Sequence, residues 1–174
     1  SNLLSEKYQF IGNGLGNTAT TRYSVIVGGV GNRAYGGASF IGGGSGNFIP
    51  SSSSNGIIIG GAFNSGITIY SIIVGGRMNI TSGNFGVILG GTANTTSGVH
   101  STILNGKNNL ATNTYSLIAS GVRNLANEMG ATVLNGNRNS GSGQYSTVIN
   151  GTGNTATANF STIIGGKANT ATGV

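Results

Sequence analysis

The chain has 174 residues, of which 34 are glycine and only 6% are charged, with a net charge of +6. Ordinary domains carry about 25% charged residues, but the 37% of hydrophobic residues fall in a regular pattern, which argues against disorder. The dominance of Gly, Ser, Thr, Asn, Ile and Val disfavours helix, the lack of Cys excludes disulfides and thiolate metal sites, and no apolar run is long enough for a membrane-spanning helix.

An asparagine recurs along the whole chain at a nearly constant interval. Nine of the ten intervals are 15 residues long, and the interval that crosses Pro50 is 17. A glycine lies three places before each of these asparagines, and an Ile or Val lies six places before. The eleven asparagines are Asn17, Asn32, Asn47, Asn64, Asn79, Asn94, Asn109, Asn124, Asn139, Asn154 and Asn169. A period this strict predicts a single all-β solenoid over residues 1–174, with one coil per repeat.

Each coil is expected to begin with a short strand. With the recurring Asn as position 0, positions −9 to −5 alternate between two faces. Positions −8 (mostly Ser) and −6 (Ile or Val) suit the narrow interior, whereas positions −9 (often aromatic), −7 and −5 point the other way. The expected strands, in chain order, are 8–12, 23–27, 38–42, 55–59, 70–74, 85–89, 100–104, 115–119, 130–134, 145–149 and 160–164.

The Gly-x-x-Asn stretch that follows is expected to form the corner of the coil. Glycine permits a positive φ or a close backbone approach, and stacked asparagines are expected to form an inward amide ladder. Ala at position +2 supplies a small inward residue for a second strand. The ladder residues on which this prediction rests most firmly are Asn79, Asn94, Asn109, Asn124, Asn139, Asn154 and Asn169.

One insertion interrupts the array. The segment 50–54, Pro-Ser-Ser-Ser-Ser, adds two residues to its coil, and we expect a surface loop there. Such a loop is either simply tolerated or part of a binding face, with Arg33, Tyr35, Phe48 and Phe63 nearby. The last Asn is followed by only five residues, and we expect the array to belong to a longer fibre.

Position −5 is Val, Ile or Leu in eight of the eleven coils, opposite to the inward Ile at −6. The first strand is therefore apolar on both faces, and one face would remain as a long exposed stripe on a monomer. Burial of this stripe about a fibre axis predicts a homotrimer of parallel chains. The alternative is a single-chain β-roll that uses the stripe to bind a ligand.

The repeat resembles a known family of surface proteins. The segments 71–79, SIIVGGRMN, and 161–171, STIIGGKANTA, are similar to the head repeats of trimeric autotransporter adhesins, the YadA-like heads, with one extra residue at the Gly-Gly corner. They are equally similar to 15-residue repeats of phage and large-virus fibre proteins. The resemblance implies a left-handed, trimeric parallel β-roll with a structural and adhesive function, extracellular, on a virion or a bacterial surface.

The basic residues gather at the Asn corner. Five of the eight Lys and Arg residues lie at positions −2 or −1, namely Arg77, Lys107, Arg123, Arg138 and Lys167. Stacked coils would turn them into a basic ridge suited to anionic glycans or phosphates. The other interpretation is a solvated edge that keeps the rod soluble. We expect no nucleic acid partner and no membrane insertion by this segment.

The composition argues against an enzyme. The only acids are Glu6 and Glu128, about eight coils apart, and no Asp is present. A metal site, a Ser-His-Asp triad and a carboxylate pair are therefore excluded, and no cofactor is expected. His100, the only histidine, lies in the aromatic column at −9, where we expect it to pack.

Ice binding is a rival function of another class. Thr102, Thr132, Thr147 and Thr162 share position −7 and could form a flat rank on a monomeric solenoid. Val, Phe, Ile or Leu interrupt this rank in the other coils.

Overall fold

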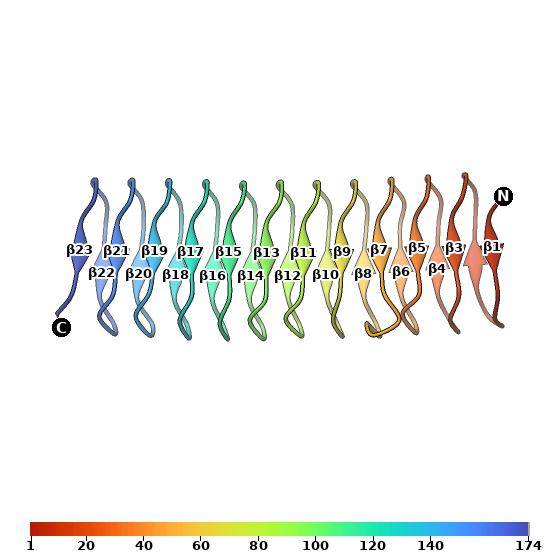
Figure 1. Ribbon diagram of the computed structural model, residues 1–174, viewed down its shortest axis with the longest axis horizontal. Helices are drawn as coiled ribbons and strands as arrows, with labels where there is room; N and C mark the ends of the chain where they lie inside the picture. Colours follow the sequence, from red (N-terminus) through yellow and green to blue (C-terminus); the bar gives the residue numbers. More distant parts are fainter. Residues whose placement is uncertain (174) are drawn as a thin grey trace.

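The chain forms a parallel β-solenoid in a computed structural model that describes residues 1–173. Each coil contributes two strands of two residues, and strands from successive coils stack into two sheets of 12 and 11 strands. All paired strands run parallel, and odd-numbered strands pair only with odd-numbered ones. Figure 1 shows the coils in a regular straight row, with the two termini at opposite ends of the rod.

Sheet A lies just after the recurring Asn, at positions +1 and +2. Its strands are β1 (Leu3–Leu4), β3 (Thr18–Ala19), β5 (Arg33–Ala34), β7 (Phe48–Ile49), β9 (Ser65–Gly66), β11 (Ile80–Thr81), β13 (Thr95–Thr96), β15 (Leu110–Ala111), β17 (Leu125–Ala126), β19 (Ser140–Gly141), β21 (Thr155–Ala156) and β23 (Thr170–Ala171).

Sheet B lies at positions −7 and −6. Its strands are β2 (Phe10–Ile11), β4 (Val25–Ile26), β6 (Phe40–Ile41), β8 (Ile57–Ile58), β10 (Ile72–Ile73), β12 (Val87–Ile88), β14 (Thr102–Ile103), β16 (Leu117–Ile118), β18 (Thr132–Val133), β20 (Thr147–Val148) and β22 (Thr162–Ile163).

The register keeps every repeat position in one column. Ile72 pairs with Val87 and Ile73 with Ile88, a step of one 15-residue coil. A third column of single parallel bridges runs along position −2, from Leu15 to Lys167. The coil is thus held to its neighbours by two sheets and by this corner column, which the sequence did not predict.

The core is a single narrow column between the two sheets. The Ile and Val residues at −6 are buried, as are the alanines at +2, except that Ile11 and Ala171 in the end coils are partly buried, and both inward positions are confirmed. Where one residue of this space is glycine, a larger side chain from the same or the next coil fills the room beside it. A Cβ added to Gly86 would lie 2.8 Å from Oγ1 of Thr96, and one added to Gly56 would lie 3.1 Å from Cγ2 of Ile49. Close packing of so thin an interior therefore restricts each pair of facing residues.

The strands of sheet B are shorter than the sequence predicted. Only positions −7 and −6 are strand, so the expected strand 145–149 is reduced to β20. Position −9 instead adopts a left-handed conformation; Tyr145, for example, has φ 55°. The reason is that a 15-residue coil must turn twice. The N–H of Ser24 at −8 donates to the carbonyl of Thr21, which closes the second corner just before the strand.

The insertion in the fourth coil stays at this second corner. Ser53 N–H donates to the Pro50 carbonyl at 3.0 Å, forming a turn from which Ser51 and Ser52 emerge exposed. Figure 1 shows this turn as a bulge between β7 and β8. Stacking resumes at once, because Asn64 bonds Asn47 across the 17-residue interval just as other asparagines do across 15. The expected surface loop is therefore present.

No helix in residues 1–173 is long and apolar enough to cross a membrane.

Candidate functional site

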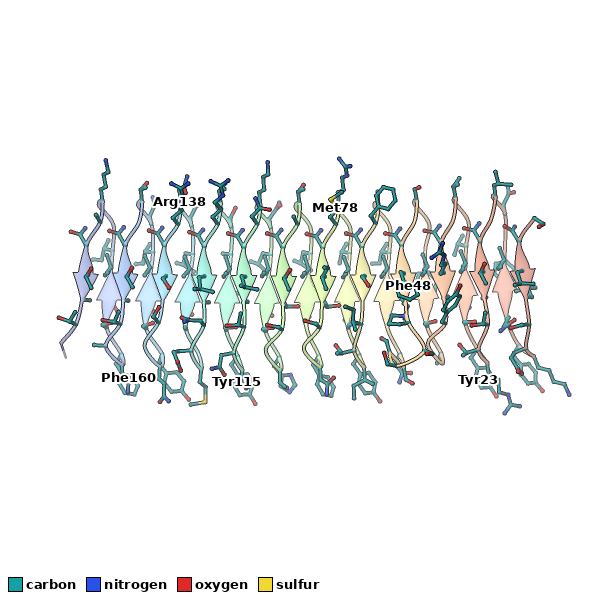
Figure 2. All side chains as sticks on the ribbon, in the orientation of Figure 1. Tyr23, Phe48, Met78, Tyr115, Arg138 and Phe160 are labelled. Carbon is teal, nitrogen blue, oxygen red and sulfur yellow. The ribbon has the colours of Figure 1, made fainter. Side chains whose placement is uncertain are left out.

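The rod presents two outer sheet faces and two edges with different chemistry. We call the edge at positions −2 and −1 the basic edge, and the edge at positions −11 to −9 the aromatic edge. Figure 2 shows Arg138 and Met78 projecting from the first, and Tyr23, Tyr115 and Phe160 from the opposite one. The predicted basic residues and the predicted aromatic column thus lie on opposite sides of the molecule.

The asparagine corner supports the basic edge. The Oδ1 of each Asn accepts the main-chain N–H of the Asn one coil further, and its Nδ2 donates to two carbonyls. For Asn79 these carbonyls belong to Gly75, at 3.0 Å, and to Gly91, at 3.1 Å. The asparagines are inward and buried as predicted, but they bond backbone groups and not one another's amides. The expected amide–amide ladder is wrong in this respect, because each side chain replaces missing main-chain partners at the corner.

The ladder begins earlier than the sequence analysis recognised. Oδ1 of Asn2 accepts the N–H of Asn17 at 3.1 Å. The signal was available, because Asn2 lies 15 residues before Asn17. It was missed because no glycine three places before and no Ile or Val six places before accompanies Asn2 in the sequence.

Close backbone contact explains the glycine at −3. Gly76 has φ +85°, and an added Cβ would lie 2.2 Å from the carbonyl oxygen of Gly91. A left-handed φ and a neighbouring coil at this distance exclude any side chain. The corner therefore brings successive coils together through bare backbone.

Three of the five predicted basic residues come together on this edge. Arg123 N–H donates to the carbonyl of Lys107, and Arg138 N–H to that of Val122, so Lys107, Arg123 and Arg138 occupy three successive coils. All three are exposed, and a coil rises about 4.8 Å. Arg77 and Lys167 lie on the same edge, each two coils from this group. The three central cations form a positive ridge that is exposed along three successive coils.

The outer face of sheet B is apolar and exposed. At position −5, Val74 is 37%, Leu89 45% and Leu104 40% exposed, as the alternation predicted. Position −7 adds Ile57, Ile72 and Val87 to the same face.

A second feature of this face is position −4, which is Gly in six of the eleven coils and Asn or Ser in the other five. An added Cβ at Gly60, Gly75, Gly90 or Gly165 would meet nothing within 4 Å, and none of these residues has a left-handed φ. Nothing within this chain therefore requires glycine there. This differs from the −3 column, where the fold itself excludes a side chain.

No protein-family model matches the chain, and no curated protein matches its sequence. The function must be argued from the surfaces themselves.

The aromatic edge carries a ladder of stacked rings. Tyr70, Phe85, His100 and Tyr115 stack in order, with ring centroids 5.1, 4.7 and 5.3 Å apart. His100 thus packs between two aromatic rings. Shorter stacks join Tyr8 to Tyr23 and Tyr145 to Phe160.

These rings stand on an unfavourable backbone. The eight stacked residues have φ between 55 and 61°, a region that costs a bulky residue about 1–2 kcal/mol. The Tyr and Phe rings remain 40 to 68% exposed, and stacking contributes about 0.5–1.5 kcal/mol per pair. Asn55 and Gly130, which favour this conformation, share the column. The presence of Asn and Gly at position −9 of these two coils was the indication in the sequence that this position belongs to a turn.

The threonine rank lies on the apolar face. Thr132, Thr147 and Thr162 stack in direct register, but Leu117 separates them from Thr102. The exposed Ile149 and Ile164 at −5 run beside this rank. Within residues 1–173 no three His, Cys, Asp or Glu side chains gather as metal ligands, and no enclosed pocket forms.

Proposed function

We propose that the chain is a non-enzymatic, structural and adhesive segment of a trimeric surface fibre. The fibre is extracellular, on a virion or a bacterial cell, and the solenoid is left-handed, as the resemblance to adhesin heads implies. The observation that carries the proposal is the apolar outer face of sheet B, which continues along the rod. An apolar face of this length is a contact surface on a soluble protein.

A second copy is the occupant that this face fits best. Position −5 is Val, Ile or Leu in eight of the eleven coils, so a parallel copy in register meets apolar residues along most of its length. Cyclic symmetry closes such a contact and leaves no apolar face exposed. Three chains are the number that the resemblance implies.

The glycines at −4 give part of the apolar face a low profile, in six of the eleven coils. Gly60, Gly75 and Gly90 lie beside the exposed −5 residues and have open space where a side chain would be. The other five coils carry Asn or Ser at this position, so glycine is not required along the whole rod.

Attachment is assigned to the basic edge. Lys107, Arg123 and Arg138 are exposed on three successive coils, and a trimer would repeat this ridge three times. Individually weak contacts with anionic glycans or phosphates would then act together. Because the charges are exposed, salt should weaken such binding strongly.

Light scattering on the purified chain tests the assembly. We expect a trimer mass for the native chain and a monomer for Val74→Asp/Leu104→Asp, which places two charges on the apolar face. The matched control is Thr95→Asp/Thr155→Asp on the outer face of sheet A, and it should remain trimeric. A native chain that is a stable, soluble monomer contradicts the proposal.

Binding to immobilised heparin, a sulfated glycan, tests the basic edge. Changing Lys107, Arg123 and Arg138 to Ser should weaken binding at least tenfold and reduce its salt dependence. The control changes Lys7, Arg22 and Arg33 to Ser, which removes the same charge elsewhere and should weaken binding much less. Equal losses in both variants would show a non-specific effect of net charge.

The stacked rank of Thr132, Thr147 and Thr162 favours one other function, a monomeric solenoid that binds ice or a flat polysaccharide. Thermal hysteresis by a monomeric chain would support it. A trimer without thermal hysteresis would exclude it.

A further inference from the structure

The charges of the chain are divided unequally between its two edges. Both acids, Glu6 and Glu128, occupy position −11 on the aromatic edge, where Lys7 and Arg22 at −10 balance them. Arg33 lies in sheet A, and the other five cations all lie on the basic edge. The net charge of +6 thus consists of five charges on the basic edge, none on the aromatic edge and one on sheet A.

Exposed apolar side chains share the basic edge with these cations. Leu15 and Val30 at −2, and Phe63 and Met78 at −1, are 45 to 63% exposed. The ring of Phe63 lies against Gly46 of the preceding coil, where an added Cβ would be 2.8 Å from its Cδ1, and still more than half of the residue faces solvent. An edge that served only to keep the rod soluble would gain nothing from these side chains. The basic edge is therefore amphipathic.

The backbone at position −1 is unfavourable for large side chains. This position is left-handed in every coil, with φ between 54 and 67°. Four coils meet the requirement with glycine, and one meets it with Asn108. Large side chains nevertheless occupy the same column in Phe63, Met78, Arg123 and Arg138. Strain of this kind persists where a side chain serves a contact, so two apolar and two basic residues point to one partner that takes both.

The basic edge is a straight ridge. Its column of bridges at position −2 runs from Leu15 to Lys167, ten coil steps or about 48 Å. Figure 1 shows the coils in a straight row, and Figure 2 shows Met78 and Arg138 projecting on the same side. No pocket forms in the described chain, residues 1–173. Side chains on such a ridge can all touch a flat surface at the same time.

We propose that the basic edge lies along the surface of an anionic lipid membrane. Each Lys or Arg next to such a surface strengthens binding about fivefold, and exposed apolar side chains enter the headgroup layer beside them. A sulfated glycan or a nucleic acid would attract the cations equally, but it would leave Phe63 and Met78 in water. The contact is peripheral and involves side chains alone. This inference rests on the assignment of attachment to the basic edge and names the ligand.

Co-sedimentation of the full chain with lipid vesicles tests the electrostatic part. We expect retention on phosphatidylglycerol vesicles and none on phosphatidylcholine vesicles, at about 0.1 M salt, where charges more than about 10 Å from the membrane are screened. The control variant used with heparin keeps all five cations of the basic edge and should bind less than tenfold more weakly. Binding should fall about 100-fold in the variant that changes Lys107, Arg123 and Arg138 to Ser.

The apolar part needs a variant that keeps every charge. Phe63→Asn/Met78→Asn should weaken retention on phosphatidylglycerol at least fivefold. Its folding is not at risk, because Asn108 already occupies this column at φ 55°. The matched control, Val99→Asn/Phe160→Asn, removes two exposed apolar residues from the aromatic edge and should change retention less than twofold. Full retention of Phe63→Asn/Met78→Asn would overturn the proposal.

Fluorescence shows which edge meets the membrane. The chain contains no tryptophan, so a single introduced indole reports its own surroundings. Phe63→Trp should shift its emission to shorter wavelengths on phosphatidylglycerol vesicles, because the ring leaves water. Phe160→Trp, on the aromatic edge, should keep its emission. A shift in Phe160→Trp as large as that in Phe63→Trp contradicts the proposed orientation.

Heparin binding separates this inference from the proposal on which it rests. A chain that binds heparin but is not retained on phosphatidylglycerol vesicles has a polyanion as its ligand, which overturns the membrane proposal and leaves attachment by the basic edge in place. A chain that binds neither overturns both. None of these outcomes bears on the trimer, which light scattering tests separately.

Discussion

Asn79 donates its main-chain N–H to Oδ1 of Asn64 at 3.0 Å, and its own Oδ1 accepts the N–H of Asn94 at the same distance. One residue therefore links three successive coils, through its main-chain N–H on one side and its side chain on the other. Since both residues at each contact are buried, water cannot replace the bonds.

Replacing a ladder asparagine should be severely destabilising. Asn79→Ala leaves the Asn94 N–H and the carbonyls of Gly75 and Gly91 without this partner, and each unsatisfied buried group costs about 1–3 kcal/mol. We expect a loss of about 3–5 kcal/mol in the free energy of unfolding, measured by urea denaturation. Asn137→Ala, at an exposed position, should change it by less than about 0.5 kcal/mol. Similar effects of the two variants would contradict the role of the ladder.

Much of the interior follows from sequence periodicity, because the same face is buried in every coil. Ile73, Asn79 and Ala111 all lie inside as predicted. The left-handed turn at Tyr145 did not follow, because aromatic residues alternating with Ser and Ile are typical of a strand. The single β-bridges at position −2 form because the corner closes tightly enough to bring successive coils together. The pattern of residues in the repeat does not predict how tightly the corner closes.

The candidate surfaces could be predicted only in part. The periodicity placed Lys107, Arg123 and Arg138 on one edge and Leu89 on the outside. It did not reveal that Gly75 has open space whereas Gly76 touches the next coil. That distinction depends on the direction of the backbone at each position. The sequence alone does not show it, because both residues are glycine.

These two adjacent glycines should respond in opposite ways to the same substitution. Gly76→Ala places Cβ 2.2 Å from the Gly91 oxygen at φ +85°, and we expect a destabilisation of about 3 kcal/mol or more. Gly75→Ala meets nothing within the chain and should retain the native circular dichroism spectrum. The native Asn or Ser at the same position of five other coils agrees with this tolerance. Unimpaired folding of Gly76→Ala would rule out the close approach of the coils.

Two neighbouring apolar residues should likewise separate folding from assembly. Ile88 is fully buried, so Ile88→Ala should lower the free energy of unfolding by about 2–5 kcal/mol. Leu89 is 45% exposed, and Leu89→Ser should leave the fold of a single chain intact while weakening self-association. Combined denaturation and light scattering measure both effects. Loss of folding in Leu89→Ser at concentrations where the chain is monomeric would contradict this division.

Buried hydroxyls provide a further test of the interior. Oγ1 of Thr96 is buried without a hydrogen-bond partner, so Thr96→Val should be neutral or stabilising by about 1 kcal/mol. Oγ1 of Thr68 donates to the Gly83 carbonyl at 2.8 Å, and Thr68→Val should cost about 1 kcal/mol. Thermal unfolding followed by circular dichroism compares the two. A loss of stability in Thr96→Val would mean that its hydroxyl has a partner, such as a buried water.

The bond from Asn47 to Asn64 spans two extra residues without any change in its geometry. The asparagine bond therefore forms whenever the chain completes one whole coil, whether that coil has 15 or 17 residues. Removal of one complete 15-residue unit, such as 95–109, would join Asn94 directly to Asn124 with every bond type preserved. A gene encoding this array can consequently change the reach of its product in unit steps by recombination between repeats, and the length of the rod becomes a freely variable trait.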